Sequence, residues 1–127
     1  MDFDYTVKTN KTFDEAVTAV EQETAAAGFK VLHIHDVQAT LKSKGFAIDP
    51  FKIVEICNAK SAYAVLLAEV KIGLCLPCKI NVYVKNGKTV ISGMRPIILP
   101  QFFPKAKLGN LPKQIDQIMQ NIINNSK

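Results

Sequence analysis

The feature that most constrains the fold of this chain is a two-residue turn, Asn86-Gly87, set between two segments of β-strand character. Residues 79–85 alternate apolar and polar side chains, and residues 89–94 resume a strand. Asn and Gly tolerate the positive φ that a type I′ hairpin turn requires. Such a turn fixes the cross-strand pairs: Tyr83 with Val90, Val82 with Ile91 and Asn81 with Ser92. Ile80, Val82, Val84 and Ile91 then share the buried face, so the chain must contain an antiparallel sheet.

The N-terminal half shows strands alternating with helices. Residues 3–9 and 29–35 predict strands, separated by a helix that a Thr12/Glu15 capping box begins and Gly28 ends. Asp36 is a candidate cap for a short helix that ends at Gly45. These local signals place two strands before the middle of the chain.

The remaining elements surround the hairpin. Residues 51–57 predict a strand, and Asn58 caps a helix that carries Tyr63, Leu66, Leu67 and Val70 before Gly73. A Pro-rich apolar connection, residues 95–104, leads to a final helix with a stripe of Ile115, Ile118, Met119 and Ile122. We expect this helix to fray over residues 124–127.

This order of elements predicts an α+β fold with a single antiparallel sheet, helices on one face and short extra helices. The 127 residues, 48% of them hydrophobic, suit one domain spanning residues 1–127. No apolar stretch approaches the roughly 20 residues of a spanning helix, and the N-terminus is acidic where a secretory signal would be basic. We therefore expect a cytoplasmic protein with no membrane partner.

Charge is divided unevenly along the chain. Residues 1–70 carry seven Lys and ten acidic residues, a net charge of −3, whereas residues 71–127 carry nine basic residues and only Asp116, a net charge of +8. The split would suit either a basic face for nucleic acid or attraction between the two halves of one fold. The basic residues are scattered singly without a recognition motif, so we expect no nucleic-acid partner.

The cysteines and histidines are the candidates for thiol or metal chemistry. Cys75 and Cys78 form a C-x-x-C pair, but a strand follows them where a redox pair needs a helix N-terminus. A structural zinc site needs four ligands, which only Cys57, His33 and His35 could complete. The odd number of cysteines favours reduced thiols. Metal binding, redox chemistry and inert buried thiols therefore stay open as alternatives.

Glu55 is the most suggestive polar residue in the predicted strands. It lies between Val54 and Ile56 and shares a side of its strand with Cys57, while Cys78 begins the next strand. A buried carboxylate is costly unless it is hydrogen-bonded, and perturbed groups concentrate in functional sites. We expect Glu55, Cys57 and Cys78 to line one site, in which the carboxylate would raise the pKa of a neighbouring thiol. The alternative is a solvated Glu55 on the outer face of the sheet.

Three blocks of sequence together resemble the domain-of-unknown-function family 302. They are residues 29–42, which include the run Asp36-Val37-Gln38-Ala39-Thr40-Leu41-Lys42, then Glu55-Ile56-Cys57-Asn58, then residues 74–78 with Leu76-Pro77-Cys78. The blocks occur in the order of the family with similar separations. The resemblance covers residues 3–94.

The resemblance implies a TATA-binding-protein-like arrangement, β-α-β(4)-α, and a tendency to form a homodimer, but it implies no activity. The recurrent polar positions of the family correspond here to Asp36, Glu55, Cys57, Asn58 and Cys78. Cys75 stands where the family usually has an aliphatic residue, so the C-x-x-C pair does not carry a chemistry shared by the family.

Two functions follow from these observations. No nucleophile elbow, phosphate loop or Ser/His/Asp set is present, so the sequence leans away from an enzyme without deciding the question, and we expect no cofactor. The first function is a non-enzymatic module that binds a small molecule or a partner, with Asp36, Glu55, Cys57, Asn58 and Cys78 as ligand-binding candidates. The second is thiol-based redox chemistry or metal binding at Cys57, Cys75 and Cys78.

Overall fold

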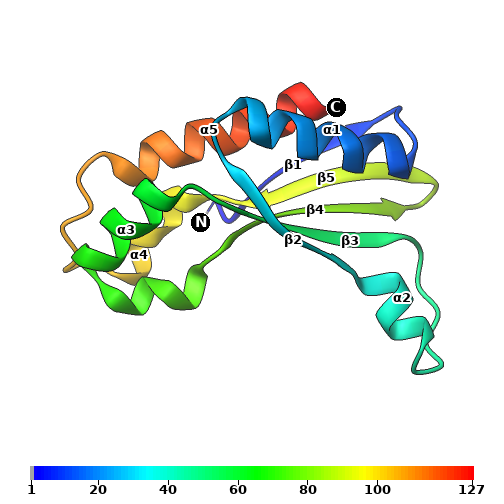
Figure 1. Cartoon of the computed structure of the whole chain (residues 1–127), viewed down its shortest axis with the longest axis horizontal. Helices are drawn as coiled ribbons and strands as arrows, with labels where there is room; N and C mark the ends of the chain where they lie inside the picture. Colours follow the sequence, from blue (N-terminus) through cyan, green and yellow to red (C-terminus); the bar gives the residue numbers. More distant parts are fainter. Residues whose placement is uncertain (1) are drawn as a thin grey trace.

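A computed structural model describes residues 2–127 of the chain. Its centre is one antiparallel five-stranded sheet with the strand order β1-β5-β4-β3-β2 (Figure 1). The strands are β1 (Asp4–Thr9), β2 (Lys30–Asp36), β3 (Phe51–Cys57), β4 (Cys78–Lys85) and β5 (Lys88–Met94). The helices are α1 (Phe13–Ala26), α2 (Val37–Lys42), α3 (Ala59–Ala68), α4 (Leu99–Phe102) and α5 (Leu111–Ser126), with 3₁₀ helices η1 (Val70–Cys75) and η2 (Pro96–Ile98). The α+β prediction is confirmed.

The β4–β5 hairpin has the predicted turn and register. Asn86 and Gly87 both have positive φ, 52° and 75°, as a type I′ turn requires. All three predicted pairs are present, including Val82 with Ile91, and both of these side chains are fully buried. The local turn therefore determines the face that the hairpin presents to the core.

Helices α1 and α5 cover one face of the sheet and form the main core with it (Figure 1). The Thr12/Glu15 capping box begins α1 as predicted, and the core side of α5 is formed by Ile115, Met119, Ile122 and Ile123. Gly93 lets α5 approach β5 closely, because a Cβ there would lie 3.1 Å from Cδ1 of Ile123. The expectation of helices on one face holds for these two long helices.

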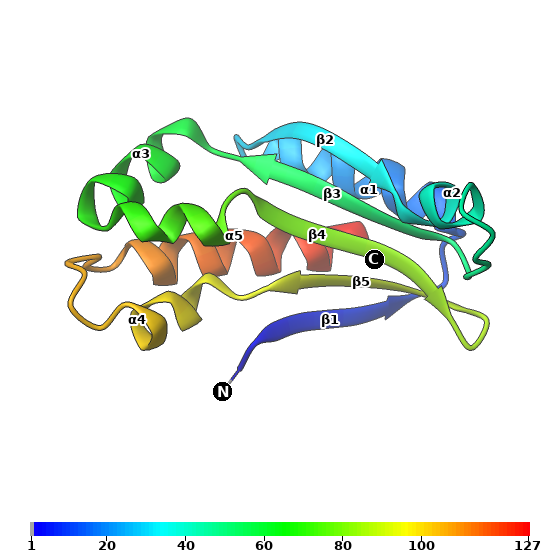
Figure 2. The ribbon, with the colours of Figure 1, turned by 90° about the horizontal axis from the view of Figure 1, so that it is seen from below.

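The shorter helices lie beyond the ends of the sheet. Helices α3 and α4 with η1 gather at one end, where Val65, Ile72, Leu99 and Leu108 form a second, smaller core. Helix α2 projects at the opposite end and buries none of its residues. Among residues 2–127, no helix stands in front of the other face of the sheet, which Figure 2 shows from below. Phe51 and Tyr83 stack on that face with ring centroids 5.3 Å apart.

The end of α5 is ordered rather than frayed. The helix continues to Ser126, whose side chain is buried and whose hydroxyl donates to the carbonyl of Ile122 at 2.6 Å. Lys11 donates to the carbonyl of Ser126 at 2.8 Å, and the Tyr5 hydroxyl donates to Asn124 at 2.8 Å. The polar composition of this segment had suggested fraying because these long-range partners are invisible in the local sequence.

Within residues 2–127, no helix is long and apolar enough to cross a membrane.

Candidate functional site

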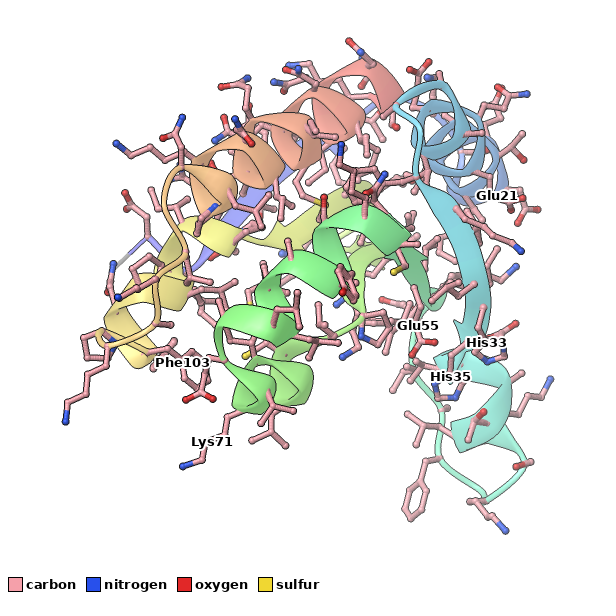
Figure 3. The ribbon with its side chains drawn as sticks, turned by 60° about the vertical axis from the view of Figure 1, so that its left-hand side comes forward. Glu21, His33, His35, Glu55, Lys71 and Phe103 are labelled. Carbon is pink, nitrogen blue, oxygen red and sulfur yellow. The ribbon has the colours of Figure 1, made fainter. Side chains whose placement is uncertain are left out.

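An apolar hollow lies where β3 ends and β4 begins, beneath α3. Its volume is about 40 Å³. The lining residues come from six parts of the chain: Phe29, Ile56, Cys57, Asn58, Ser61, Ala62, Val65, Leu76, Cys78, Pro96, Leu99 and Ile115. None of them carries a charge. Figure 3 shows α3 and α4 at this end of the molecule, with α5 above them.

Asn58 builds the wall of the hollow. Its Oδ1 accepts a hydrogen bond from the Ser61 backbone N–H at 2.9 Å, which caps α3, and its Nδ2 donates to the Gly28 carbonyl at 3.2 Å. A residue that caps a helix N-terminus in this way satisfies one of its free backbone donors. Asn58 therefore lies at the predicted site, but both ends of its amide already hold the fold together.

Cys57 and Cys78 come together at the hollow, as predicted. They lie at adjoining ends of neighbouring strands, and both line the hollow. Burial raises the pKa of the Cys78 thiol to about 11, and the neighbouring Cys57 contributes to the same shift. A thiol with such a pKa is neutral at physiological pH, so Cys78 presents a weakly polar group rather than a nucleophile.

Glu55 does not join this site. Ile56 pairs with Cys78 across β3 and β4, whereas Glu55 pairs with Lys79, so Glu55 and Cys78 lie on opposite faces of the sheet. On its other side Glu55 pairs with His33 of β2. The predicted convergence of all three residues is wrong, and the raised pKa of Cys78 has burial rather than a carboxylate as its main cause.

Asp36 lies far along the sheet from the hollow. It pairs with Lys52 near the start of β3, whereas Cys57 ends that strand. Its Oδ1 accepts from the Ala39 backbone N–H at 2.9 Å, which caps α2 as predicted. Asp36 therefore has a structural role in a helix remote from the hollow.

The candidate metal ligands are spread over two places. The two histidines lie on β2, where His33 pairs with Glu55 (Figure 3) and His35 shares a hydrogen bond of 3.0 Å with Thr40, whereas Cys57 lines the hollow. Cys75 and Cys78 line a second hollow of about 30 Å³. Across residues 2–127, no three His, Cys, Asp or Glu side chains are grouped so that they could hold a metal ion. This geometry disfavours the proposed zinc-type set.

The two hollows adjoin each other. Leu76, Cys78, Pro96 and Leu99 line both, and the second is completed by Cys75, Lys79 and Met94. Leu76 and Cys78 flank Pro77, at the junction between η1 and β4. Leu76 and Cys78 therefore lie between the two hollows.

A partly buried ion pair that was not predicted from the sequence fixes one side of the hollow. Arg95 donates from Nε and an Nη to the two carboxylate oxygens of Asp116, at 3.2 and 3.0 Å, and Gln120 donates to Asp116 at 2.8 Å. The Arg95 backbone N–H also donates to the Phe3 carbonyl at 2.8 Å. The contact with Asp116 raises the pKa of Arg95. Because Pro96 directly follows Arg95, the ion pair positions a residue that lines the hollow. The signal in the sequence that could have predicted the pair is Asp116, a single acidic residue beside the apolar stripe of α5.

Comparisons with known proteins agree with this fold. The family model described as "Domain of unknown function DUF302" matches residues 5–126. The crystal structure of an uncharacterized conserved DUF302 protein from Bacillus stearothermophilus is similar over 100% of both chains, with 29% sequence identity and a TM-score of 0.93. A search of curated proteins finds no match. With nearly all of its length covered by the family model, the chain belongs to the DUF302 family.

Proposed function

We propose that the protein is a non-enzymatic binding module whose ligand is a small uncharged molecule held beneath α3. The observation that carries this proposal is the lining of the hollow: apolar side chains, two cysteines, one serine and an asparagine whose amide is already engaged. Ligand sites are typically apolar with a few convergent polar groups. Here the polar lining residues besides Asn58 are Cys57, Ser61 and Cys78.

The volume of the hollow limits the size of the ligand. At about 40 Å³ it holds a few small groups, whereas sites for drug-sized molecules are roughly 300 to 1,000 Å³. The adjoining hollow offers further space if Leu76 moves. Helix α3 is also held loosely, since Val65 is its only fully buried residue. A ligand of several carbon atoms would therefore enter by shifting Leu76 and α3.

Two observations favour binding over thiol chemistry. The raised pKa of Cys78 leaves little thiolate at neutral pH, although thiolate is the nucleophile and the metal ligand. In addition, no three metal-ligating side chains are grouped within the described part of the chain. Both support a role for the cysteines as lining residues.

The proposal is tested with 1-hexanol, by the shift that it causes in the thermal unfolding midpoint. Ala62 lines the hollow and Ala64 is exposed on the same helix, so Ala62→Leu and Ala64→Leu are a matched pair. We expect 1-hexanol to raise the midpoint of the wild type and of Ala64→Leu but not of Ala62→Leu. An absent shift in the wild type, or an equal shift in both variants, would reject the hollow as the site.

Native mass spectrometry of freshly purified protein complements this test. A retained mass that is lost in Ala62→Leu and kept in Ala64→Leu would identify the ligand and support the proposal. A retained metal ion would instead favour the thiol alternative.

A further inference from the structure

The outer side of α3 and η1 presents large apolar side chains to solvent. Tyr63 is 67% exposed, Leu67 70%, Val70 73% and Leu74 87%. Tyr63 and Leu67 are four residues apart and so lie on one face of α3. We call these four residues the outer apolar patch. Contiguous apolar surface of this kind marks an interaction site more often than it occurs by chance.

The fold itself leaves the patch outside. The inner side of α3 and η1 already packs against the protein, with Val65 and Ile72 in the second core. Leu66 fills the space beside Gly73, where a Cβ would lie 3.5 Å from its Cδ2. The segment from α3 to η1 therefore packs through Val65 and Ile72, and Leu67 and Leu74 lie outside the core.

The surroundings of the patch are basic. The two segments at this end of the molecule, residues 59–75 and 96–115, contain five lysines and one acid: Lys60, Lys71, Lys105, Lys107, Lys113 and Glu69. The two segments pack together through the second core. Lys71 extends outward from η1 (Figure 3), and the Glu69 carboxylate accepts a hydrogen bond from the Lys71 backbone N–H at 3.3 Å. Lysines therefore outnumber acidic residues five to one in the two segments that form this end of the molecule.

This charge distribution distinguishes between possible occupants. In a two-fold dimer the same patch would meet itself, so the lysines of one copy would approach those of the other. An anionic lipid surface has the complementary charge, and it accepts apolar side chains at the boundary between headgroups and acyl chains. The geometry and the charge together favour the lipid surface.

We propose that the outer apolar patch docks on an anionic lipid surface, with Leu67, Val70 and Leu74 inserted and Lys71 and the other lysines of this end on the headgroups. The sequence had suggested no membrane partner because it contains no spanning segment, but peripheral docking needs none. Helix α3 separates the patch from the hollow, so docking would bring the proposed ligand site next to the bilayer. The docking is independent of the proposed function and goes beyond it.

Vesicle flotation of the full chain tests the proposal, with vesicles of phosphatidylcholine alone and of phosphatidylcholine mixed with phosphatidylglycerol. We expect binding to the mixed vesicles that weakens as salt rises. Leu74→Ser should weaken binding about tenfold, since burying a leucine contributes about 1.5 to 3 kcal/mol. Lys71→Ala should weaken it about fivefold, since a surface lysine contributes about 1 kcal/mol.

Matched controls come from the opposite end of the molecule. Phe46 is 64% exposed and Lys44 is exposed, both following α2. Phe46→Ser and Lys44→Ala should bind vesicles as the wild type does. All four substitutions are at exposed positions, and circular dichroism checks that each variant is folded.

Three outcomes would overturn the proposal: no binding to the mixed vesicles, equal loss in the controls, or binding that is indifferent to phosphatidylglycerol. A dimer in sedimentation that Leu74→Ser dissociates, without vesicle binding, would assign the patch to a second copy instead.

Discussion

The Cys78 thiol lies where the first residue of β4 meets the hollow, and burial raises its pKa to about 11 from an ordinary 9.0. Because alkylation requires thiolate, we expect iodoacetamide at neutral pH to label Cys78 more slowly than glutathione, and faster as pH approaches 11. Mass spectrometry of the digested protein measures the rate at each cysteine. Labelling of Cys78 well above the rate of glutathione would favour catalytic thiol chemistry over the binding module.

The same pKa shift links stability to pH. A thiol whose pKa is higher in the folded than in the unfolded state stabilises the fold fully below the unfolded pKa, and this contribution is lost as pH rises through the folded pKa. We therefore expect the wild type to lose stability relative to Cys78→Ala between about pH 9 and pH 11. Urea unfolding of both proteins measures the difference, which should be constant below pH 8.

Asp116 is the residue whose loss we expect to cost most outside the hydrophobic core. Its side chain is buried and accepts hydrogen bonds from Arg95 and Gln120. Asp116→Asn would place amide hydrogens against these donors. Breaking a buried pair costs about 3 to 5 kcal/mol, and partial exposure of Arg95 puts the expected loss near 3 kcal/mol. Urea unfolding is the measurement, with Asp49→Asn in an exposed loop as the control; equal stability of the two variants would contradict the prediction.

At the scale of elements, the β4–β5 hairpin supports the core through Ile91. This residue is fully buried opposite Val82, so Ile91→Ala should lower the free energy of unfolding by about 2 to 5 kcal/mol. Gly87→Val should also destabilise, because a β-branched residue resists the positive φ of the turn. Chemical denaturation checks both. A loss under about 0.5 kcal/mol for Ile91→Ala would mean that the side chain does not support the core.

The elements that could be predicted from the sequence are those fixed by contacts within a few residues. The Thr12/Glu15 box, the Asp36 and Asn58 caps and the Asn86-Gly87 turn each act locally, and the structure contains all four. The register of β3 against β4 is different, since twenty residues separate these strands and no tight turn sets their alignment. A shift of one residue moves every side chain to the other face, which is why Glu55 was misplaced.

The candidate site shows the same division. Cys57 and Cys78 were predicted from the alternation of their strands and Asn58 from the family resemblance, and all three line the hollow. The pairing of Arg95 with Asp116 joins the end of β5 to α5, and the outward face of α3 depends on which side the second core occupies. Helical spacing identifies an apolar stripe, but it does not say what the stripe contacts.

At the scale of the whole molecule, the acidic and basic halves of the chain are joined by one ion pair among residues 2–127. Arg95 of the basic half lies 3.6 Å from Asp2 of the acidic half. Attraction between the halves is therefore a local effect at the start of η2. The expectation of no nucleic-acid partner stays a prediction.

The homodimer expected from the family resemblance needs a contact surface. The apolar connection of residues 95–104 is one candidate by its composition, but its Ile98 and Leu99 fold inward and are buried. The uncovered face of the sheet (Figure 2) is the better candidate, because the stacked Phe51 and Tyr83 lie on it beside Ile53, among polar residues such as Asn81 and Ser92. An antiparallel sheet whose second face meets only water is usually polar there.

We therefore propose that two copies associate through the uncovered sheet face, and expect the wild type to sediment at twice its 14.0 kDa at high micromolar concentration. Ile53→Lys should give the monomer, since it places a charge beside the stacked rings at the proposed contact. Leu32→Lys, on the outer strand β2 where the side chain is already half exposed, is the matched control and should remain a dimer. The Phe102→Asp variant should also remain a dimer, because Phe102 belongs to α4, which lies outside the uncovered sheet face. A monomeric wild type would refute self-association, and a dimeric Ile53→Lys variant would move the contact to another surface.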